Sequence, residues 1–159
     1  MKERDGEAMR ISTRGRYGLK AIVDIAAMQD GDKCVSLKSV AERQGLSENY
    51  LEQIIAPLRK ARIVSSVRGS QGGYYLTRPP EELTVGDVLR VLEGPMAPIG
   101  CVLEDSFDSC GEANCKVCAT KSVWQALFSK INETVDSITI ANLVEQGLAN
   151  SNDMKGKLL

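Results

Sequence analysis

A tight glycine turn between two short helical patterns constrains the fold of this chain most. Ser36 can cap a helix that runs through Val40 and Arg43, and the residues Gln-Gly-Leu at 44–46 then end it. Ser47 can cap the next helix, which reads SENYLEQIIAPLRKA. Two short helices joined by a glycine-containing turn are typical of a helix-turn-helix unit.

A short β-hairpin is predicted directly behind these two helices. Residues 63–67 and 74–77 are β-prone, and the intervening Arg-Gly-Ser-Gln-Gly-Gly favours a turn. Ser12 or Thr13 can cap a further helix ahead of the unit, and this helix ends before the turn-forming residues 30–32. A hairpin behind a helix-turn-helix is a wing. The sequence therefore predicts a mostly α fold with a small β-hairpin wing.

The second half of the chain predicts a connecting helix and then a long helix with an uncovered apolar stripe. Thr84 can cap the connecting helix with Asp87 as its reciprocal partner, and Gly94-Pro95 ends it. Thr120 can cap the long helix. Because one helix cannot bury its own stripe, we expect the same helix of a second subunit to cover it in a homodimer. The stripe consists of Val123, Leu127, Ile131, Val135 and Ile138, with Trp124 and Phe128 beside it.

These patterns divide the chain into an N-terminal domain and a long C-terminal dimerisation helix, separated by a loop. The loop shows no sustained period, and loops of that length are uncommon unless they are functional. The expected segments are a disordered N-terminal extension at 1–8, a winged helix-turn-helix domain at 9–80, a connecting helix at 81–94, a cysteine-rich loop at 95–118, a dimerisation helix region at 119–147 and a flexible tail at 148–159.

Charge is divided unequally between the two halves of the chain. Residues 1–80 carry 14 Lys and Arg against 9 Asp and Glu, a formal charge of +5. Residues 81–159 carry 6 against 12, a formal charge of −6. The basic half is therefore a candidate for binding a polyanion.

Composition excludes several classes of function. The chain has no histidine, which rules out a Ser-His-Asp triad, a Cys-His pair and every zinc site that needs imidazole. We therefore expect neither an enzyme nor a small-molecule substrate. No apolar run reaches the roughly 18 residues that span a membrane, and the N-terminus MKERDGEAMR is not a secretory signal. The cytoplasm is the expected location, with no membrane partner.

The start of the helix at Ser47 offers side chains that can read DNA. Asn and Gln can pair with adenine, and Glu can accept from cytosine, in the major groove. Arg68 lies at the wing tip, next to glycines that let the backbone come close, which suits insertion into a minor groove. The alternative is that these residues form the solvated face of a small helical domain. The predicted DNA-binding residues, facing a double-stranded operator, are Arg14, Ser47, Asn49, Tyr50, Glu52, Gln53, Arg68, Gly69 and Gln71.

Four cysteines are clustered in the loop as Cys101-x8-Cys110-x4-Cys115-x2-Cys118. The spacing of the last three matches that of plant-type 2Fe–2S proteins, and soft thiolates suit such a cluster. A 4Fe–4S cluster, a zinc ion and a thiol redox switch are the alternatives that the spacing leaves open. Only one C-x2-C hook is present, whereas structural zinc sites usually have two.

Three stretches of the chain resemble the IscR/NsrR/CymR family of dimeric winged-helix transcription regulators, with the greatest likeness to IscR-type members. These stretches are RISTRGRYGLKAIVDIA, the run AERQGLSENYLEQIIAPLRKARIVSSVRGSQGGYYL, and CATKSVW after the cysteine loop. Many members carry an iron–sulfur cluster. The resemblance therefore implies a repressor or activator that senses cluster status through a 2Fe–2S cluster and controls iron–sulfur cluster assembly genes.

The resemblance also implies which residues hold the cluster. The family's three loop cysteines correspond to Cys101, Cys110 and Cys118, and a histidine of IscR-type members is replaced here by Lys121. Arg16 stands where some relatives have an acidic ligand, so Cys115 is the candidate for the fourth ligand. A nitric-oxide sensor, a thiol-sensing regulator of cysteine metabolism and an electron-transfer iron–sulfur protein are the alternative functions.

Overall fold

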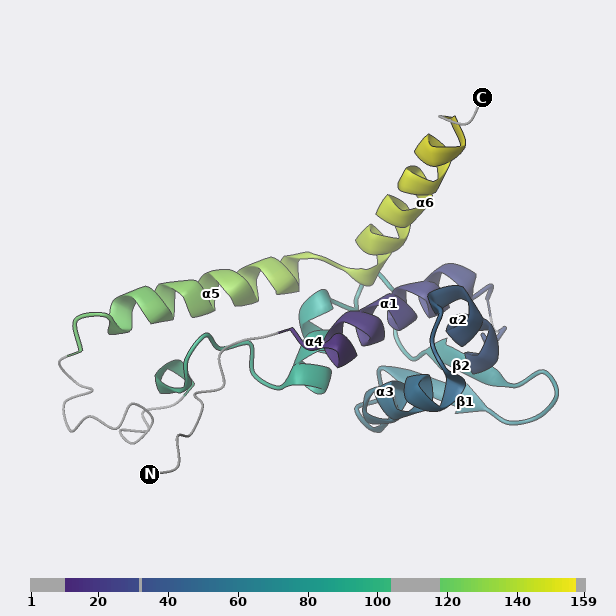
Figure 1. Cartoon of the computed structure of the whole chain (residues 1–159), viewed down its shortest axis with the longest axis horizontal. Helices are drawn as coiled ribbons and strands as arrows, with labels where there is room; N and C mark the ends of the chain where they lie inside the picture. Colours follow the sequence, from purple (N-terminus) through teal and green to yellow (C-terminus); the bar gives the residue numbers. More distant parts are fainter. Residues whose placement is uncertain (1–10, 32, 104–117, 157–159) are drawn as a thin grey trace.

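The computed structural model describes residues 11–31, 33–103 and 118–156, the last six of these through their backbone alone. A head formed by the first helices and a hairpin lies at one end of the molecule, a long helix extends away from it, and the last helix projects outward (Figure 1). The elements are α1 (Thr13–Met28), α2 (Leu37–Gln44), α3 (Glu48–Lys60), β1 (Val64–Val67), β2 (Gly73–Leu76), α4 (Val85–Glu93), the 3-10 turn η1 (Gly100–Val102), α5 (Lys121–Ser137) and α6 (Ile140–Gly156). The mostly α fold with a small hairpin wing is confirmed.

The three helices of the head begin where the sequence predicts. The hydroxyl oxygens of Ser12, Ser36 and Ser47 each accept a hydrogen bond from a backbone N–H three residues on, which satisfies an otherwise unpaired donor of the first turn. Gly45 has φ 65°, the left-handed conformation that ends α2 and turns the chain into α3. These caps and this turn fix the angle between α2 and α3.

The wing is a two-stranded antiparallel hairpin in which Val64 pairs with Leu76. A residue from the turn between α1 and α2 adds to it, because the backbone groups of Val35 and Tyr74 exchange two hydrogen bonds of 2.8 Å. A Cβ on Gly73 would lie 2.5 Å from the Val35 carbonyl oxygen, so this close pairing requires glycine. The base of the wing is therefore attached to the helical part of the head.

One apolar core holds the head together. It is built from α1, α2, α3 and the two strands, and α4 and α6 close it through Leu83, Val88, Leu92 and Ile140. The predicted capping box of α4 is present, with hydrogen bonds between the Thr84 hydroxyl and the Asp87 N–H and between the Thr84 N–H and the Asp87 carboxylate.

The C-terminal part differs from the expectation in two ways. Thr120 precedes α5 but makes no side-chain capping bond, so the predicted cap is wrong. The region 119–147 is two helices rather than one, and α6 stays helical to Gly156, within the segment 148–159 expected as a flexible tail. The expected extension at 1–8 lies outside the described residues.

The break between α5 and α6 has a local cause. The Thr139 hydroxyl accepts from the Asn142 N–H, and the Asn142 side chain accepts from the Thr139 N–H, which starts a new helix. Residues on either side of Thr139 pair with the segment before α4, since the Val85 N–H donates to Ile138 and the Ile140 N–H donates to Leu83. This pairing orients α6 against α1.

Candidate DNA interface and cysteine site

The predicted reading residues lie on one face of α3. Ser47, Asn49, Glu52 and Gln53 are exposed, while the opposite face of the helix is buried in the core. Because only the core face is used for packing, this polar face is open to a partner over the first two turns of the helix. The residues that hold the other side are Leu51, Ile54, Ile55 and Leu58.

Two of the predicted residues also have structural contacts. The Ser47 hydroxyl oxygen accepts from the Tyr50 N–H at 3.3 Å, which leaves the hydroxyl hydrogen for another acceptor. The ring of Tyr50 is half-buried and packs edge-on against Tyr17, with centroids 6.3 Å apart. Arg16 and Lys20 lie over the Tyr17 ring at 5.1 and 5.9 Å from its centroid. Tyr17 was not among the predicted DNA-binding residues.

An ion pair with a buried carboxylate joins α2 to α1. Asp24 is only 8% exposed, and its carboxylate accepts from Arg43 at 2.6 Å and from the side chain of Gln44 at 2.9 Å. The hydrogen bonds that Arg43 donates to Asp24 raise the pKa of Arg43 above its ordinary value. The sequence signal for this link, which was not predicted, is an aspartate on the apolar face of a predicted helix.

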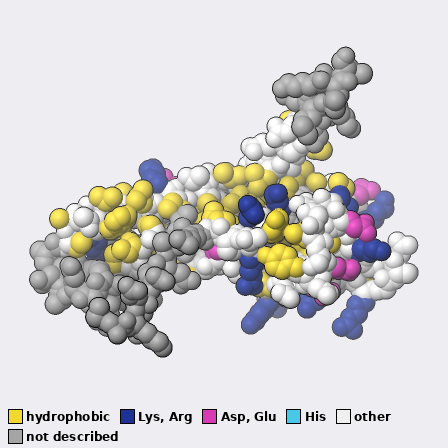
Figure 2. All heavy atoms as spheres, viewed as in Figure 1, with side chains coloured by type: hydrophobic (Ala, Val, Ile, Leu, Met, Phe, Trp, Pro, Cys, Tyr) yellow, Lys and Arg dark blue, Asp and Glu magenta, His cyan; other side chains and the backbone are white. Residues whose placement is uncertain are grey.

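The wing tip carries the other predicted DNA-binding residues. Arg68, Gly69 and Gln71 are all exposed, and Gly69 has φ 119°, which side-chain-bearing residues rarely adopt. The Gly72 N–H donates to the Gly69 carbonyl at 3.0 Å and closes the turn. Arg14, the remaining predicted residue, is exposed in the first turn of α1. Figure 2 shows Lys and Arg side chains along the lower edge of the head.

Two of the four loop cysteines are described, and both lie next to α5. Cys101 is 7% exposed in the 3-10 turn η1, which packs against α5 (Figure 1). Cys118 is exposed just before α5 begins, with its sulfur 3.2 Å from the Thr120 hydroxyl oxygen. Cys110 and Cys115 lie outside the described residues. Thiolates of Cys101 and Cys118 suit an iron–sulfur cluster, and the burial of Cys101 would shield one side of that cluster.

Comparison with known proteins identifies the family. A family model described as Rrf2, iron-dependent transcriptional regulator, matches residues 11–146. The chain belongs to the Rrf2 family. The family resemblance predicted from the sequence is thereby confirmed, and the homologues of this Rrf2 chain are transcriptional regulators.

Relatives of this Rrf2 chain carry two different names. It is 42% identical over 135 residues to the transcriptional regulator CymR of Bacillus subtilis (strain 168), covering 85% of this chain and 89% of the relative. It is 36% identical over 139 residues to the regulator IscR of Sodalis glossinidius (strain morsitans), covering 86% and 79%.

Solved structures show the same two names. The structure of B. subtilis CymR, described as the global cysteine regulator, matches with a TM-score of 0.70 and 42% identity, covering 86% of this chain and 97% of that one. The structure of T. potens IscR matches with a TM-score of 0.66 and 47% identity, covering 87% and 88%. The winged-helix fold of this Rrf2 chain is therefore shared with both.

The first half of the long helix α5 is uncovered. None of the residues of α5, all of which the structure describes, is buried, and Val123 and Leu127 are 53% and 44% exposed. Hydrophobic side chains gather over α5 in Figure 2. Among the described residues, no helix is long and apolar enough to cross a membrane. Within the described residues, Val123 and Leu127 at the start of the stripe thus lack a partner, whereas Ile131 and Val135 pack partly against the α4 residues Val85 and Leu89.

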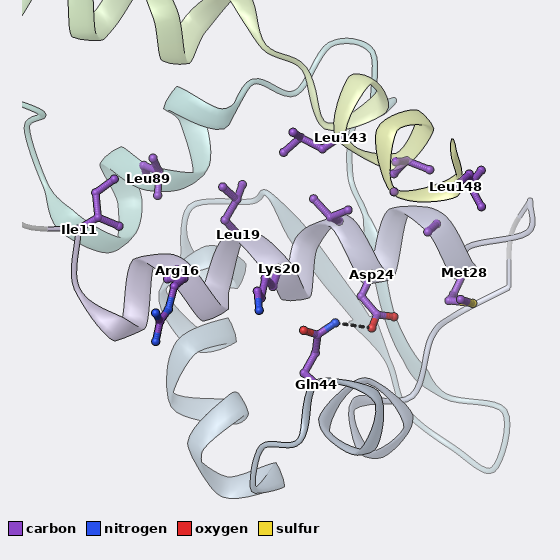
Figure 3. A pocket seen from close by; sticks show the side chains of 14 residues that line it. Ile11, Arg16, Leu19, Lys20, Asp24, Met28, Gln44, Leu89, Leu143 and Leu148 are labelled. Carbon is purple, nitrogen blue, oxygen red and sulfur yellow. Dashed lines mark hydrogen bonds between the residues drawn. The ribbon is translucent and has the colours of Figure 1, made fainter. Parts of the chain in front are cut away.

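An apolar groove of about 830 Å³ runs between α1 and α6 of the Rrf2 chain. Figure 3 shows Leu19 from α1 and Leu143 from α6 pointing into the gap between these helices. Two residues at the far end of the groove, Met28 and Leu148, are 54% and 60% exposed. The groove and the stripe of α5 are both apolar surfaces that a folded monomer leaves in water.

A bidentate ion pair fixes α5 to α4 in this Rrf2 chain. Two nitrogens of the Arg90 guanidinium donate to the two carboxylate oxygens of Asp136 at 2.8 and 2.7 Å, and one also donates to Asn132 at 2.7 Å. These hydrogen bonds raise the pKa of Arg90 and lower the pKa of Asp136. A Cβ on Gly86 would lie 2.1 Å from an Asp136 oxygen, so the helices approach closely only because residue 86 is glycine.

Proposed function

We propose that this chain is a homodimeric, DNA-binding Rrf2 regulator that senses iron–sulfur cluster status and controls iron–sulfur cluster assembly genes, as a repressor. The observation that supports DNA reading is the polar, exposed face of α3 beside the exposed Arg68. Each α3 would enter the major groove of one half-site, and each wing would reach the neighbouring minor groove.

The residues assigned to DNA have distinct tasks in this proposal. Asn49, Glu52 and Gln53 can form hydrogen bonds to base edges, because their side chains extend from the exposed face of α3. The hydroxyl hydrogen of Ser47, the phenol of Tyr50 and the cation of Arg14 suit phosphate oxygens. At the wing, Gly69 allows close approach of the backbone, and Gln71 lies beside Arg68 to share its contacts.

Dimer formation would cover the apolar surfaces that the single chain exposes. The stripe of α5 and the groove between α1 and α6 are of the same chemical character, and a second copy offers both surfaces at once. Burying the two exposed side chains Val123 and Leu127 would remove apolar area from water, at about 25 cal/mol per Å². The near-palindromic operator follows from the twofold symmetry of such a dimer.

The cluster would be held by Cys101, Cys110 and Cys118, with Cys115 as the candidate fourth ligand. A bound 2Fe–2S cluster would supply a sulfur-ligated redox centre whose loss or oxidation reports cluster supply. The chain's own contribution is to keep Cys101 shielded in η1 against α5 and to present Cys118 directly before that helix. A 4Fe–4S cluster and a zinc ion are the competing occupants.

A second candidate function is the thiol-based control of cysteine metabolism. It is favoured by the 42% identity to the B. subtilis protein described as the global cysteine regulator. Under that function the loop cysteines would act as thiols without a metal. A nitric-oxide-sensing regulator of the same fold would, like the first proposal, contain iron.

The metal content of the protein separates these functions. We expect anaerobically purified protein to be coloured and to contain iron and acid-labile sulfide in equal amounts, with Cys110→Ser and Cys118→Ser each lowering both. Cys34→Ser is the matched control, because Cys34 lies outside the loop, and it should keep the wild-type iron content. A colourless protein without iron contradicts cluster sensing, and zinc in its place supports the zinc alternative.

DNA reading is tested at the wing. We expect Arg68→Ala to weaken operator binding by about 1–3 kcal/mol, because a groove-inserted cation is lost. Fluorescence anisotropy over a series of salt concentrations would measure this loss and the number of phosphate contacts.

Lys130→Ala is the matched control for the wing variant, since it removes an equal charge from an exposed site on α5. It should leave operator affinity nearly unchanged. Equal affinities of the Arg68 variant and wild type would remove Arg68 from the interface. A complete lack of salt-dependent DNA binding would instead favour an electron-transfer protein.

A further inference from the structure

The last residue of α4 makes a polar contact with the first turn of α1. Oε1 of Glu93 accepts a hydrogen bond from the Ser12 hydroxyl at 2.5 Å, and Oε2 accepts from the Ser12 N–H at 3.3 Å. The Ser12 hydroxyl oxygen in turn accepts from the Gly15 N–H at 3.2 Å. Glu93 therefore supports the cap of α1 from a position 81 residues further along the chain.

Two glycines of α1 form the surface that receives the end of α4. A Cβ on Gly15 would lie 2.2 Å from Oε1 of Glu93, and a Cβ on Gly18 would lie 2.2 Å from Cδ1 of Leu92. Both glycines have ordinary helical conformations, so their role is to allow close approach rather than an unusual backbone. The carboxylate also lies at the positive end of the α1 dipole, which favours an anion there.

The other end of this contact leads to the cysteine segment. Gly94 follows Glu93 with φ 82° and ends α4, and Met96 is 2% exposed in a cluster with Val85 and Leu89. Cys101 is buried in the turn that follows. A displacement of residues 94–101 therefore acts directly on the last turn of α4 and on the carboxylate of Glu93.

We propose that Glu93 is the positioning residue through which the cysteine segment sets the first turn of α1. That turn carries Arg14 and Arg16, both exposed cations on the strongly basic part of the chain. Movement of Glu93 changes where these cations lie relative to a DNA backbone, whereas α3 stays held by the core. This inference rests on the proposed DNA-binding function and adds to it the contact that links the two sites.

The test compares operator affinity in two states of the full chain. Reduced protein without metal and protein reconstituted anaerobically with ferrous iron and sulfide are each titrated against the operator at fixed salt. We expect Glu93→Gln, which keeps the size of the side chain, to bring the affinity ratio of the two states at least about fivefold closer to one. Gly15→Ala, which displaces the carboxylate, should act in the same direction.

Glu82→Gln is the matched control, because Glu82 is an exposed carboxylate in the turn before α4. It removes the same charge and should keep the wild-type ratio. Loss of charge alone would raise DNA affinity equally in both states, so the ratio separates positioning from simple electrostatics. Melting temperatures and iron contents equal to wild type would show that the variants fold and load normally.

Three results would overturn the inference. The first is a wild-type ratio retained by Glu93→Gln and Gly15→Ala. The second is a wild-type protein that holds iron and sulfide but binds DNA equally in both states. The third is additive effects on operator affinity in a Ser12→Ala and Glu93→Gln double-mutant cycle on the metal-free protein, which would exclude coupling between the two residues. This cycle is the deciding test if the protein binds no iron, in which case the proposed cluster function has failed separately.

Discussion

The head and α5 are stabilised in different ways. In the head, buried side chains from α1, α2, α3 and both strands form one continuous core, and serine hydroxyls cap its three helices. In α5 no residue is buried, and the helix begins without a side-chain cap. The core of the head is closed by α4 and α6, whereas α5 is attached to the chain chiefly through α4 and depends on another surface to cover Val123 and Leu127 at the start of its apolar stripe.

The difference extends to the way charge is used. The two arginines, Arg43 in the head and Arg90 in α4, are both 36% exposed, but their carboxylate partners differ: Asp24 is 6% exposed and Asp136 is 45% exposed. Salt screens an ion pair less when one of its members is buried than when both are exposed. The joint between α4 and α5 is thus the more adjustable of the two.

The largest expected effect is the loss of the dimer on introducing a charge into the α5 stripe. Leu127→Asp should convert the protein to monomers, because an unpaired carboxylate would have to be desolvated at the interface. Operator affinity should fall by about 100-fold or more, since two linked heads bind jointly. Sedimentation equilibrium and anisotropy would measure the two effects.

Gln125→Asp is the control for this variant, because Gln125 is exposed and lies on a different face of α5. It should stay dimeric. If Leu127→Asp remains dimeric, the exposed part of the α5 stripe is not the dimer interface.

A stabilising change in the head would sharpen the comparison. Arg62 has φ 58°, a left-handed conformation that costs a side-chain-bearing residue about 1–2 kcal/mol. It follows α3 in a turn where the Ile63 N–H donates to the Leu58 carbonyl at 2.9 Å. Arg62→Gly should raise the free energy of unfolding by about 1 kcal/mol in chemical denaturation.

The neighbouring Ala61→Gly is the matched control, since Ala61 has φ −78° and gains nothing from glycine there. It should lower stability by about 0.5–1 kcal/mol. The gain from Arg62→Gly should leave dimer dissociation unchanged, and a parallel shift in dissociation would show that the head and α5 are energetically coupled.

The smallest expected effect is the loss of the stabilisation by Arg90 and Asp136 at low pH. The pKa of Asp136 is lowered by the hydrogen bond from Arg90, so the pair stabilises the fold above the ordinary aspartate pKa of about 4. This contribution is lost as the pH falls through the lowered value. Because both side chains are more than a third exposed, it amounts to less than about 1 kcal/mol. Asp136→Asn should remove this pH dependence from denaturation curves, and an unchanged acid limb would exclude the pair as its source.

Local signals predicted most of the head. Ser12, Ser36 and Ser47 cap helices because short hydroxyl side chains satisfy first-turn amides, and this chemistry needs no tertiary contact. The link between Asp24 and Arg43 was not predicted, since it joins residues 19 apart whose proximity depends on how α2 packs on α1.

The C-terminal half was harder to predict for the same physical reason. The capping pair of Thr139 and Asn142 was a local signal in the sequence, but the uninterrupted apolar period through Ile138 favoured one continuous helix. Thr120 failed as a cap because its backbone has the helical conformation and its hydroxyl lies against the Cys118 sulfur. Assembly of the four cysteines remains a prediction, since Cys110 and Cys115 lie outside the described residues.

The backbone pairing of Val35 with Tyr74 has a consequence for operator design. It ties the wing to the turn that leads into α2, so the reading helix and the wing tip keep a constant separation. The length of sequence recognised within one half-site should therefore be the same in every state of the protein. In addition to the position of the α1 cations, regulation can vary the number of base pairs between the centres of the two half-sites, and binding to operators with altered spacers would reveal such a change.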